Sequence, residues 1–343
     1  MPLSLRRGRV TRIVERHEGL VRLEVDGFPC IAYPRLTGPV ALGDEVLVNV
    51  QARELGLGSG GFDVLHANLT RGLELPPDAG AHVMKLPYTP LQFATLHGEE
   101  GTEAGEVLDG LVVVACSLHS QLAPVAAALR GLRVVFAQLP GGALPVDLSD
   151  AVRELKSAGL LEASIGVDAC FGGDVDCVNV YSALTVADAR GFDVAVCGIG
   201  PGIVGTGTRY GHGAMAAAQA LHATLELGGE AVLALRLSEA DSRARHRGLS
   251  HHTEAILSLW SGSYEIAWPA GCPIDDPISD GATEVDVSDW RGACAGLTLD
   301  HMGRGPDDDP WFFAAAYAAG RLARTLAPGD ESAQTRRGPA TDT

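Results

Sequence analysis

The stretch RHRGLSHHT, residues 245–253, gathers two arginines, three histidines and two hydroxyl side chains around one glycine. Its guanidinium groups, on Arg245 and Arg247, could hold a carboxylate or a phosphate through paired N–H donors. The stretch follows the apolar run AVLALRLS, which is typical of a buried strand. We therefore interpret it as an anion-binding loop, and the alternative is a solvated turn.

Two histidines of this stretch are candidate catalytic residues. Ser250 is a suitable N-cap for a helix that begins at His251, and it is also a candidate ligand-binding residue. The positive field at a helix N-terminus favours a neutral imidazole, so His251 or His252 would serve as a general base near neutral pH. Asp241, in the same predicted loop, could orient one of the two rings.

A second glycine-rich stretch, GPGIVGTGTRYGHG, follows the apolar run DVAVCGIG. Its G-x-G-x-x-G spacing lacks both an immediate helix start and a suitable acidic residue about 20 positions on, which disfavours a nicotinamide or flavin cofactor. Its backbone N–H groups could instead cradle a phosphate or carboxylate, and the alternative is a turn imposed by tight packing. The candidate ligand-binding residues here are Gly200, Gly202, Gly205, Thr206, Gly207, Thr208 and Arg209.

Two further residues are candidates because each follows a predicted strand. Asp174, in CFGGDVDCVNVY, comes directly after a glycine pair and could assist proton transfer. The alternative is that it only stabilises a helix start. His119, in SLHSQ, is a candidate ligand-binding residue at the end of the first strand of the predicted sheet.

Metal binding is the rival interpretation of the same side chains. His212, His251, His252, Asp174 and Asp176 supply enough ligands for a divalent ion. No HExxH or comparably close spacing supports that use, and adjacent histidines in a helix point in different directions. We therefore predict a site without a metal, and a divalent metal remains the alternative cofactor.

The elements that position these residues fall into two predicted domains. At 343 residues the chain is long for one domain, and its 46% hydrophobic and 20% charged residues are typical of a globular protein. Short runs of Val, Ile and Leu between turn residues predict a small antiparallel β-barrel over 1–70. A proline-marked connector is expected over 71–110, an α/β domain over 111–326 and a disordered polar tail over 327–343.

From residue 111 onward, apolar strands alternate with amphipathic helices, one of which is expected over 174–190. This alternation predicts a doubly wound, mostly parallel α/β sheet with helices on both faces. Ligands of such sheets bind beyond the carboxyl ends of the strands. We therefore expect the stretches near residues 172, 204 and 248 to meet on one rim of the sheet.

Charge and cysteine usage restrict the partners and the compartment. The formal net charge of −17 disfavours nucleic acid as a partner, although it leaves room for a small cationic pocket. Seven cysteines without a CxxC pair are typical of buried thiols in a reducing compartment. Apolar runs long enough to span a bilayer are missing, so we expect a cytoplasmic protein without membrane contact. The sequence leaves an oligomer open.

Five separated motifs together resemble a family of uncharacterised bacterial proteins known only as a domain of unknown function. They are HVMKLPYTPLQ, FGGDVDCVNVYSAL, GPGIVGTGT, RHRGLSHHT and HMGRGPDDDPWFF. The resemblance covers about residues 1–326, and it implies a bacterial source and one continuous architecture without assigning a reaction or catalytic residues. Asp168 departs from the residue types usual ahead of FGGD in that family, so we do not place it in the site.

These observations lead to two functional hypotheses. The first is an enzyme, of hydrolase or transferase type rather than an oxidoreductase, that acts on a small anionic metabolite. Its arginines and glycine-loop amides would hold the anion while a histidine moves a proton. The second is a non-catalytic ligand-binding or regulatory module with the same anion pocket.

Overall fold

The computed structural model describes residues 3–56, 61–71, 74–259, 264–275, 278 and 281–328. Contacts between residues divide the chain into two compact units, with the division between Thr95 and Leu96. The predicted boundaries at residues 70 and 110 stay predictions. Most of the predicted tail, from residue 329 onward, lies outside the described residues.

The first unit contains a closed five-stranded barrel with the strand order β1-β2-β3-β5-β4. Val, Leu and Ala side chains that alternate along these strands fill its interior. Every neighbouring pair is antiparallel except β3 and β5, which run parallel. The small barrel predicted from the sequence is therefore confirmed, with one parallel pair. Its strands are β1 Leu5–Arg16, β2 Val21–Val25, β3 Phe28–Ala32, β4 Glu45–Asn49 and β5 Asp63–Asn68.

Short elements complete the first unit. The helices α1 and α2 span Pro34–Thr37 and Gln51–Glu54. Within the predicted connector, β6 Val83–Lys85 and β7 Phe93–Thr95 form an antiparallel hairpin.

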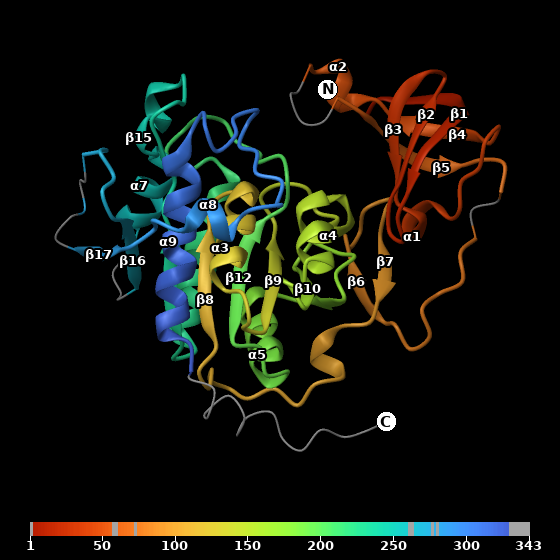
Figure 1. The fold of residues 1–343 in the computed structure, drawn as a ribbon. Helices are drawn as coiled ribbons and strands as arrows, with labels where there is room; N and C mark the ends of the chain where they lie inside the picture. Colours follow the sequence, from red (N-terminus) through yellow and green to blue (C-terminus); the bar gives the residue numbers. More distant parts are fainter. Residues whose placement is uncertain are drawn as a thin grey trace. The chain divides into compact units, whose positions relative to one another are not determined.

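The second unit is built on an eight-stranded sheet with the order β11-β10-β9-β12-β8-β13-β16-β17 (Figure 1). All seven neighbouring pairs are parallel, so the predicted α/β class is confirmed. The runs of Val, Ala, Leu and Ile are buried on both faces, as parallel strands require. The strands are β8 Val112–Cys116, β9 Val134–Leu139, β10 Ala163–Val167, β11 Val175–Cys177, β12 Val194–Ile199, β13 Glu230–Ala234, β16 Glu265–Pro269 and β17 Thr283–Val285.

Helices cover both faces of this sheet. One face packs against α3, α4, α8 and α9, and the other against α5, α6 and α7. None of the helices in the described ranges is both long and apolar enough to cross a membrane. The helices are α3 Leu122–Ala128, α4 Asp150–Ser157, α5 Val180–Ala189, α6 Ala216–Glu226, α7 His251–Ser258, α8 Trp290–Ala293 and α9 Pro310–Leu326.

The single helix expected over 174–190 is wrong in its first part. Val175–Cys177 is the edge strand β11, and α5 starts only at Val180. The side chain of Asn179 caps that helix by accepting a hydrogen bond from Ser182 N. The polar N-cap Asn179 therefore separates the strand from the helix. The spacing of apolar residues alone suggests one continuous helix.

The order of the strands creates a switch point at β8. The chain leaves β8 for α3 on one face of the sheet, whereas it leaves the neighbours β12 and β13 for α6 and α7 on the other face. Connections that diverge in this way leave a crevice beyond the carboxyl ends of the strands, which is where open α/β sheets bind ligands.

The glycine-rich loop after β12 packs backbone against backbone on the loop after β9. A Cβ atom on Gly213 would overlap the carbonyl oxygen of Gly141, and one on Gly200 would overlap that of Ala143. Tight packing, the alternative considered from the sequence, therefore accounts for Gly200.

We predict that Gly213→Ala lowers the free energy of unfolding by about 1–3 kcal/mol, because the backbone at Gly141 must move away. Urea denaturation would measure the change. Gly292→Ala is the matched control, since a Cβ atom there meets nothing within 4 Å in the short helix α8. An equal effect of both substitutions would contradict the packing that we describe.

Candidate functional site

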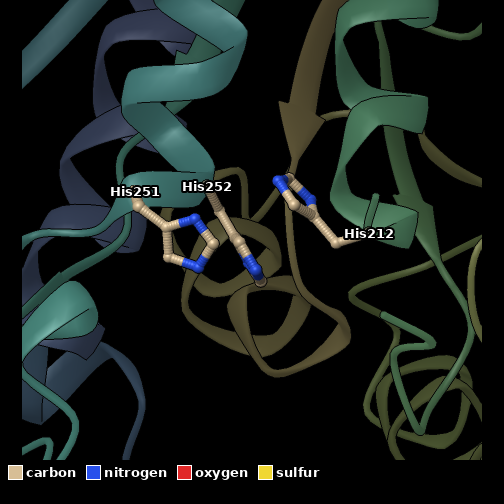
Figure 2. A group of neighbouring side chains, drawn as sticks. All are labelled: His212, His251 and His252. Atoms are coloured by element: carbon tan, nitrogen blue, oxygen red, sulfur yellow. The ribbon is translucent and has the colours of Figure 1, made fainter. Parts of the chain in front are cut away.

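Four histidine rings meet beyond the carboxyl ends of β12 and β13, and we call them the histidine cluster: His212, His246, His251 and His252. The rings of His212 and His252 are stacked, with centroids 3.9 Å apart and planes 24° from parallel. The centroids of His251 and His246 lie 4.5 and 4.9 Å from that of His252. Figure 2 shows the ring of His252 between those of His251 and His212. The stretches near residues 204 and 248 therefore meet, as predicted.

Local sequence explains how α7 presents two of these rings. The side chain of Ser250 accepts a hydrogen bond of 3.3 Å from His252 N, so it is the predicted N-cap. The same oxygen lies 2.7 Å from Nδ1 of His246. Ser250 is fully buried, and these contacts place it as a support for the cluster.

Arg236 lies behind the cluster, directly after β13, and is only 1% exposed. Its Nη1 lies 3.1 Å from Nδ1 of His252. A guanidinium group has donors only, so Nδ1 of His252 must accept this hydrogen bond with its lone pair. The neutral ring therefore carries its proton on Nε2, and His252 faces a ligand as a hydrogen-bond donor.

His212 is held in the same tautomer by a different partner. Its Nε2 lies 2.9 Å from the carbonyl oxygen of Arg209. A carbonyl oxygen can only accept, so Nε2 carries the proton and Nδ1 keeps a lone pair. That Nδ1 atom is buried and has no hydrogen-bond partner among the described residues.

All four rings of the histidine cluster are neutral at neutral pH. Burial, followed by the neighbouring histidine and arginine charges, lowers the pKa of His252 from 6.5 to about 2. Burial and the Arg236 charge lower the pKa of His246 to about 3. The pKa values of His212 and His251 are lowered too, again first by burial. The low pKa and the occupied lone pair contradict our expectation of His252 as a general base.

His251 is the better candidate for moving a proton. It is partly exposed, whereas the other three rings are buried. Its ring nitrogens have no hydrogen-bond partner among the described residues, so neither tautomer is imposed on it.

Asp241 does not orient a histidine ring, which corrects our expectation. Its carboxylate accepts two hydrogen bonds from the Arg243 side chain, and its Oδ2 also accepts from Arg236 and Arg304. Burial opposes its charge, but hydrogen bonds from Arg243 hold its pKa well below the usual range. Arg304 also pairs with Asp309 at 3.2 Å. Three guanidinium groups thus face two carboxylates, which leaves one positive charge in excess.

Another buried histidine, His301, lies near the same guanidinium groups. Nδ1 of His301 is 3.1 Å from Oγ of Ser120, which follows β8, and its ring stacks on Phe312 at 3.8 Å. Burial and the Arg236 charge lower the pKa of His301 to about 3. Nε2 of His301 and Nε of Arg236 are both buried without a hydrogen-bond partner among the described residues. The described residues therefore leave buried polar atoms unsatisfied beyond the end of β8.

Asp174 and His119, two predicted site residues, have other roles. Asp174 accepts hydrogen bonds from Ser164, at the beginning of β10, and from Lys156, at the end of α4. It therefore lies at the amino end of β10, whereas Phe171 pairs with Pro145 in the loop after β9. That the stretch near residue 172 joins the other two stays a prediction. Both ring nitrogens of His119 are engaged, by the Ile199 carbonyl at 3.0 Å and by Ser149 Oγ at 2.7 Å, so His119 ties two strand ends together.

The residues of the two predicted anion-binding loops differ in exposure and in what they contact. The exposed guanidinium of Arg245 lies about 4.0 Å from the Cβ position at Gly207, so the two predicted loops approach each other. Nε of Arg247 lies 3.4 Å from the Asp241 carbonyl oxygen, which turns this side chain away from the rings. The exposed loop residues are Gly202, Gly205, Thr206, Gly207, Thr208 and Arg209, and the two threonine hydroxyl groups lie 3.0 Å apart.

Three histidines lie close enough together to suggest a metal site, but the orientation of their rings does not suit metal ligation. His212, His251 and His252 offer nitrogens that lie within 4.8 Å of one another. Metal ligation needs lone pairs that converge in the planes of the rings, and two nearly parallel stacked rings cannot supply that. The lone pair of His252 is also directed at Arg236. Asp176 lies on β11 and Asp174 just before it, both away from these rings.

Sequence reasoning missed Arg236, which we read only as part of a buried strand. A charged residue inside an apolar run was the available signal, because arginine is almost never fully buried without partners. It also left Asp168 outside any site. Asp168 lines a separate cavity of about 290 Å³ at the ends of β9 and β10, with Tyr181, Gln219 and His222 on its walls.

Comparison with known protein families gives the following match. A family model described as "Protein of unknown function (DUF3866)" matches residues 29–320. Among curated proteins, none matches the chain.

We predict that the histidine cluster makes folding stability depend on pH. The folded pKa values lie below 6.5, so the stability that the neutral rings contribute is present above pH 6.5 and is lost as the pH falls toward 3. His252→Gln removes one such ring. Its free energy of unfolding, measured by urea denaturation, should fall by about 3 kcal/mol less than that of the wild type between pH 7 and pH 4.

The control is His222→Gln, which changes an exposed histidine on α6 outside the cluster. It should keep the pH dependence of the wild type. Identical profiles for all three proteins would mean that His252 is not held neutral by its surroundings.

Proposed function

The chain belongs to the DUF3866 family of proteins of unknown function, and we propose that it binds a small anionic metabolite at the histidine cluster. We further propose that it is an enzyme of hydrolase or transferase type. The anion would lie beyond the carboxyl ends of β12 and β13, next to the switch point at β8.

The Arg236 guanidinium is the observation that carries this proposal. Its pKa, lowered by burial to about 10, leaves it charged at neutral pH although it is 1% exposed. The carboxylates around it leave one positive charge in excess. A buried charge without full compensation is destabilising, and a bound anion would supply the compensation.

The chemistry follows from the protonation states. His252 would donate its Nε2 hydrogen to an anionic oxygen, and Arg236 behind it would strengthen that hydrogen bond. His251, the partly exposed ring, would take or return a proton. Arg245 and Arg209 would add positive charge at the exposed side. This assignment suits hydrolysis or group transfer, in which charge develops on an oxygen next to fixed donors.

The second candidate is a non-catalytic binding or regulatory module with the same pocket. It is favoured by the absence of a general base with a pKa near neutrality among the buried rings of the cluster. The two candidates share the anion and differ only in turnover.

We predict that inorganic phosphate or a small carboxylate raises the melting temperature of the wild type. The stabilisation should follow RT ln(1 + [L]/Kd), or about 2.7 kcal/mol at 100 Kd. His252→Phe keeps an aromatic ring but removes the donor, so it should weaken binding about tenfold or more in isothermal titration calorimetry.

His222→Phe is the control, and it should bind like the wild type because it lies outside the cluster. A melting temperature unmoved by phosphate, acetate and citrate would end the anion proposal. For the enzyme, His251→Gln should retain affinity and lose turnover of phosphate or carboxylate esters, whereas a binding module has no turnover to lose.

A further inference from the structure

The structure assigns a ligand class to the histidine cluster: a small anion that carries a hydroxyl group next to its charged oxygen. This inference rests on the proposed function and makes it more specific. It follows from the hydrogen positions on the stacked rings of His212 and His252, because one ring offers a donor and the other an acceptor. Hydroxy carboxylates and monohydrogen phosphate share this chemistry.

The donor is Nε2 of His252. Arg236 can only donate, so it occupies the Nδ1 lone pair and leaves the proton of the neutral ring on Nε2. The opposite tautomer would place two N–H groups against each other inside the protein, where a repulsive contact and an unsatisfied donor are both unfavourable. His252 therefore discriminates in favour of an oxygen that accepts.

The acceptor is Nδ1 of His212. The Arg209 carbonyl can only accept, so it holds the proton on Nε2 of that ring. His212 is 8% exposed, and its Nδ1 has no hydrogen-bond partner among the described residues. A buried acceptor without a donor is destabilising by about the strength of a hydrogen bond, so a ligand that brings a hydroxyl hydrogen gains affinity here.

The two rings are close enough to bind neighbouring atoms of one ligand. Their centroids are 3.9 Å apart, and one ring nitrogen of His212 lies within 4.8 Å of one ring nitrogen of His252. A carboxylate alone satisfies only the donor. A carboxylate with a hydroxyl group on the adjacent carbon satisfies the donor and the acceptor together. A divalent cation could use the lone pair of His212 but not that of His252, which already accepts from Arg236.

The test compares glycolate with acetate, which differ by one hydroxyl group, in calorimetric titrations of the full chain. The wild type should bind glycolate about three- to tenfold more tightly, the worth of one hydrogen bond. His212→Phe should lose this preference and still bind acetate. His212→Asn can place an amide oxygen near the former Nδ1 position, so it should retain part of the preference.

Each outcome is decisive for one of the two claims. If the wild type binds neither acid nor phosphate, the proposed anion site itself fails. If it binds both acids equally, or if His212→Phe keeps the preference, the anion site stands and the ligand class assigned here is wrong. Zn²⁺ binding in the same titrations, lost in His252→Phe, would replace the anion with a metal.

A ligand-free measurement covers the case in which His212→Phe does not fold. Nitrogen-15 NMR of histidine-labelled wild type distinguishes the two tautomers of each ring. Both His212 and His252 should carry hydrogen on Nε2 and none on Nδ1 at pH 7. Hydrogen on Nδ1 of either ring would overturn the assignment.

Discussion

The contact between the Arg236 guanidinium and the His252 ring is the interaction on which the site depends. An arginine cannot accept a hydrogen bond, so its position decides where the neighbouring imidazole carries its proton. It also brings a positive charge into a volume from which water is excluded, where charges interact strongly. The histidines around it stay neutral for that reason as well as because they are buried.

The parallel sheet determines where this contact lies. Arg236 stands two residues after β13, the neighbour of β8, where adjacent strands send the chain to opposite faces. The same divergence brings Ser120 from the loop after β8 and His301 from the approach to α9 into the crevice. Residues that are distant in the chain therefore share one environment because the parallel strands end together.

Three arginine side chains give the site an excess of positive charge. Arg236, Arg243 and Arg304 share the carboxylate of Asp241, and only Asp309 adds a second negative charge. This excess of positive charge supports the anion that we propose, although the whole chain carries a formal charge of −17. Local pairing, rather than net charge, is therefore the basis of that proposal.

The sequence by itself determined the barrel, the parallel α/β sheet and the helix cap at Ser250, because these depend on local patterns of apolar, turn and capping residues. It also brought the glycine-rich loop and RHRGLSHHT to one rim, since both follow parallel strands. Only the tertiary structure decided that Asp174 lies at the opposite end of β10 and that Arg236 reaches His252. Those facts depend on which atoms of distant segments become hydrogen-bond partners. The spacing of residues along one chain does not determine these partners.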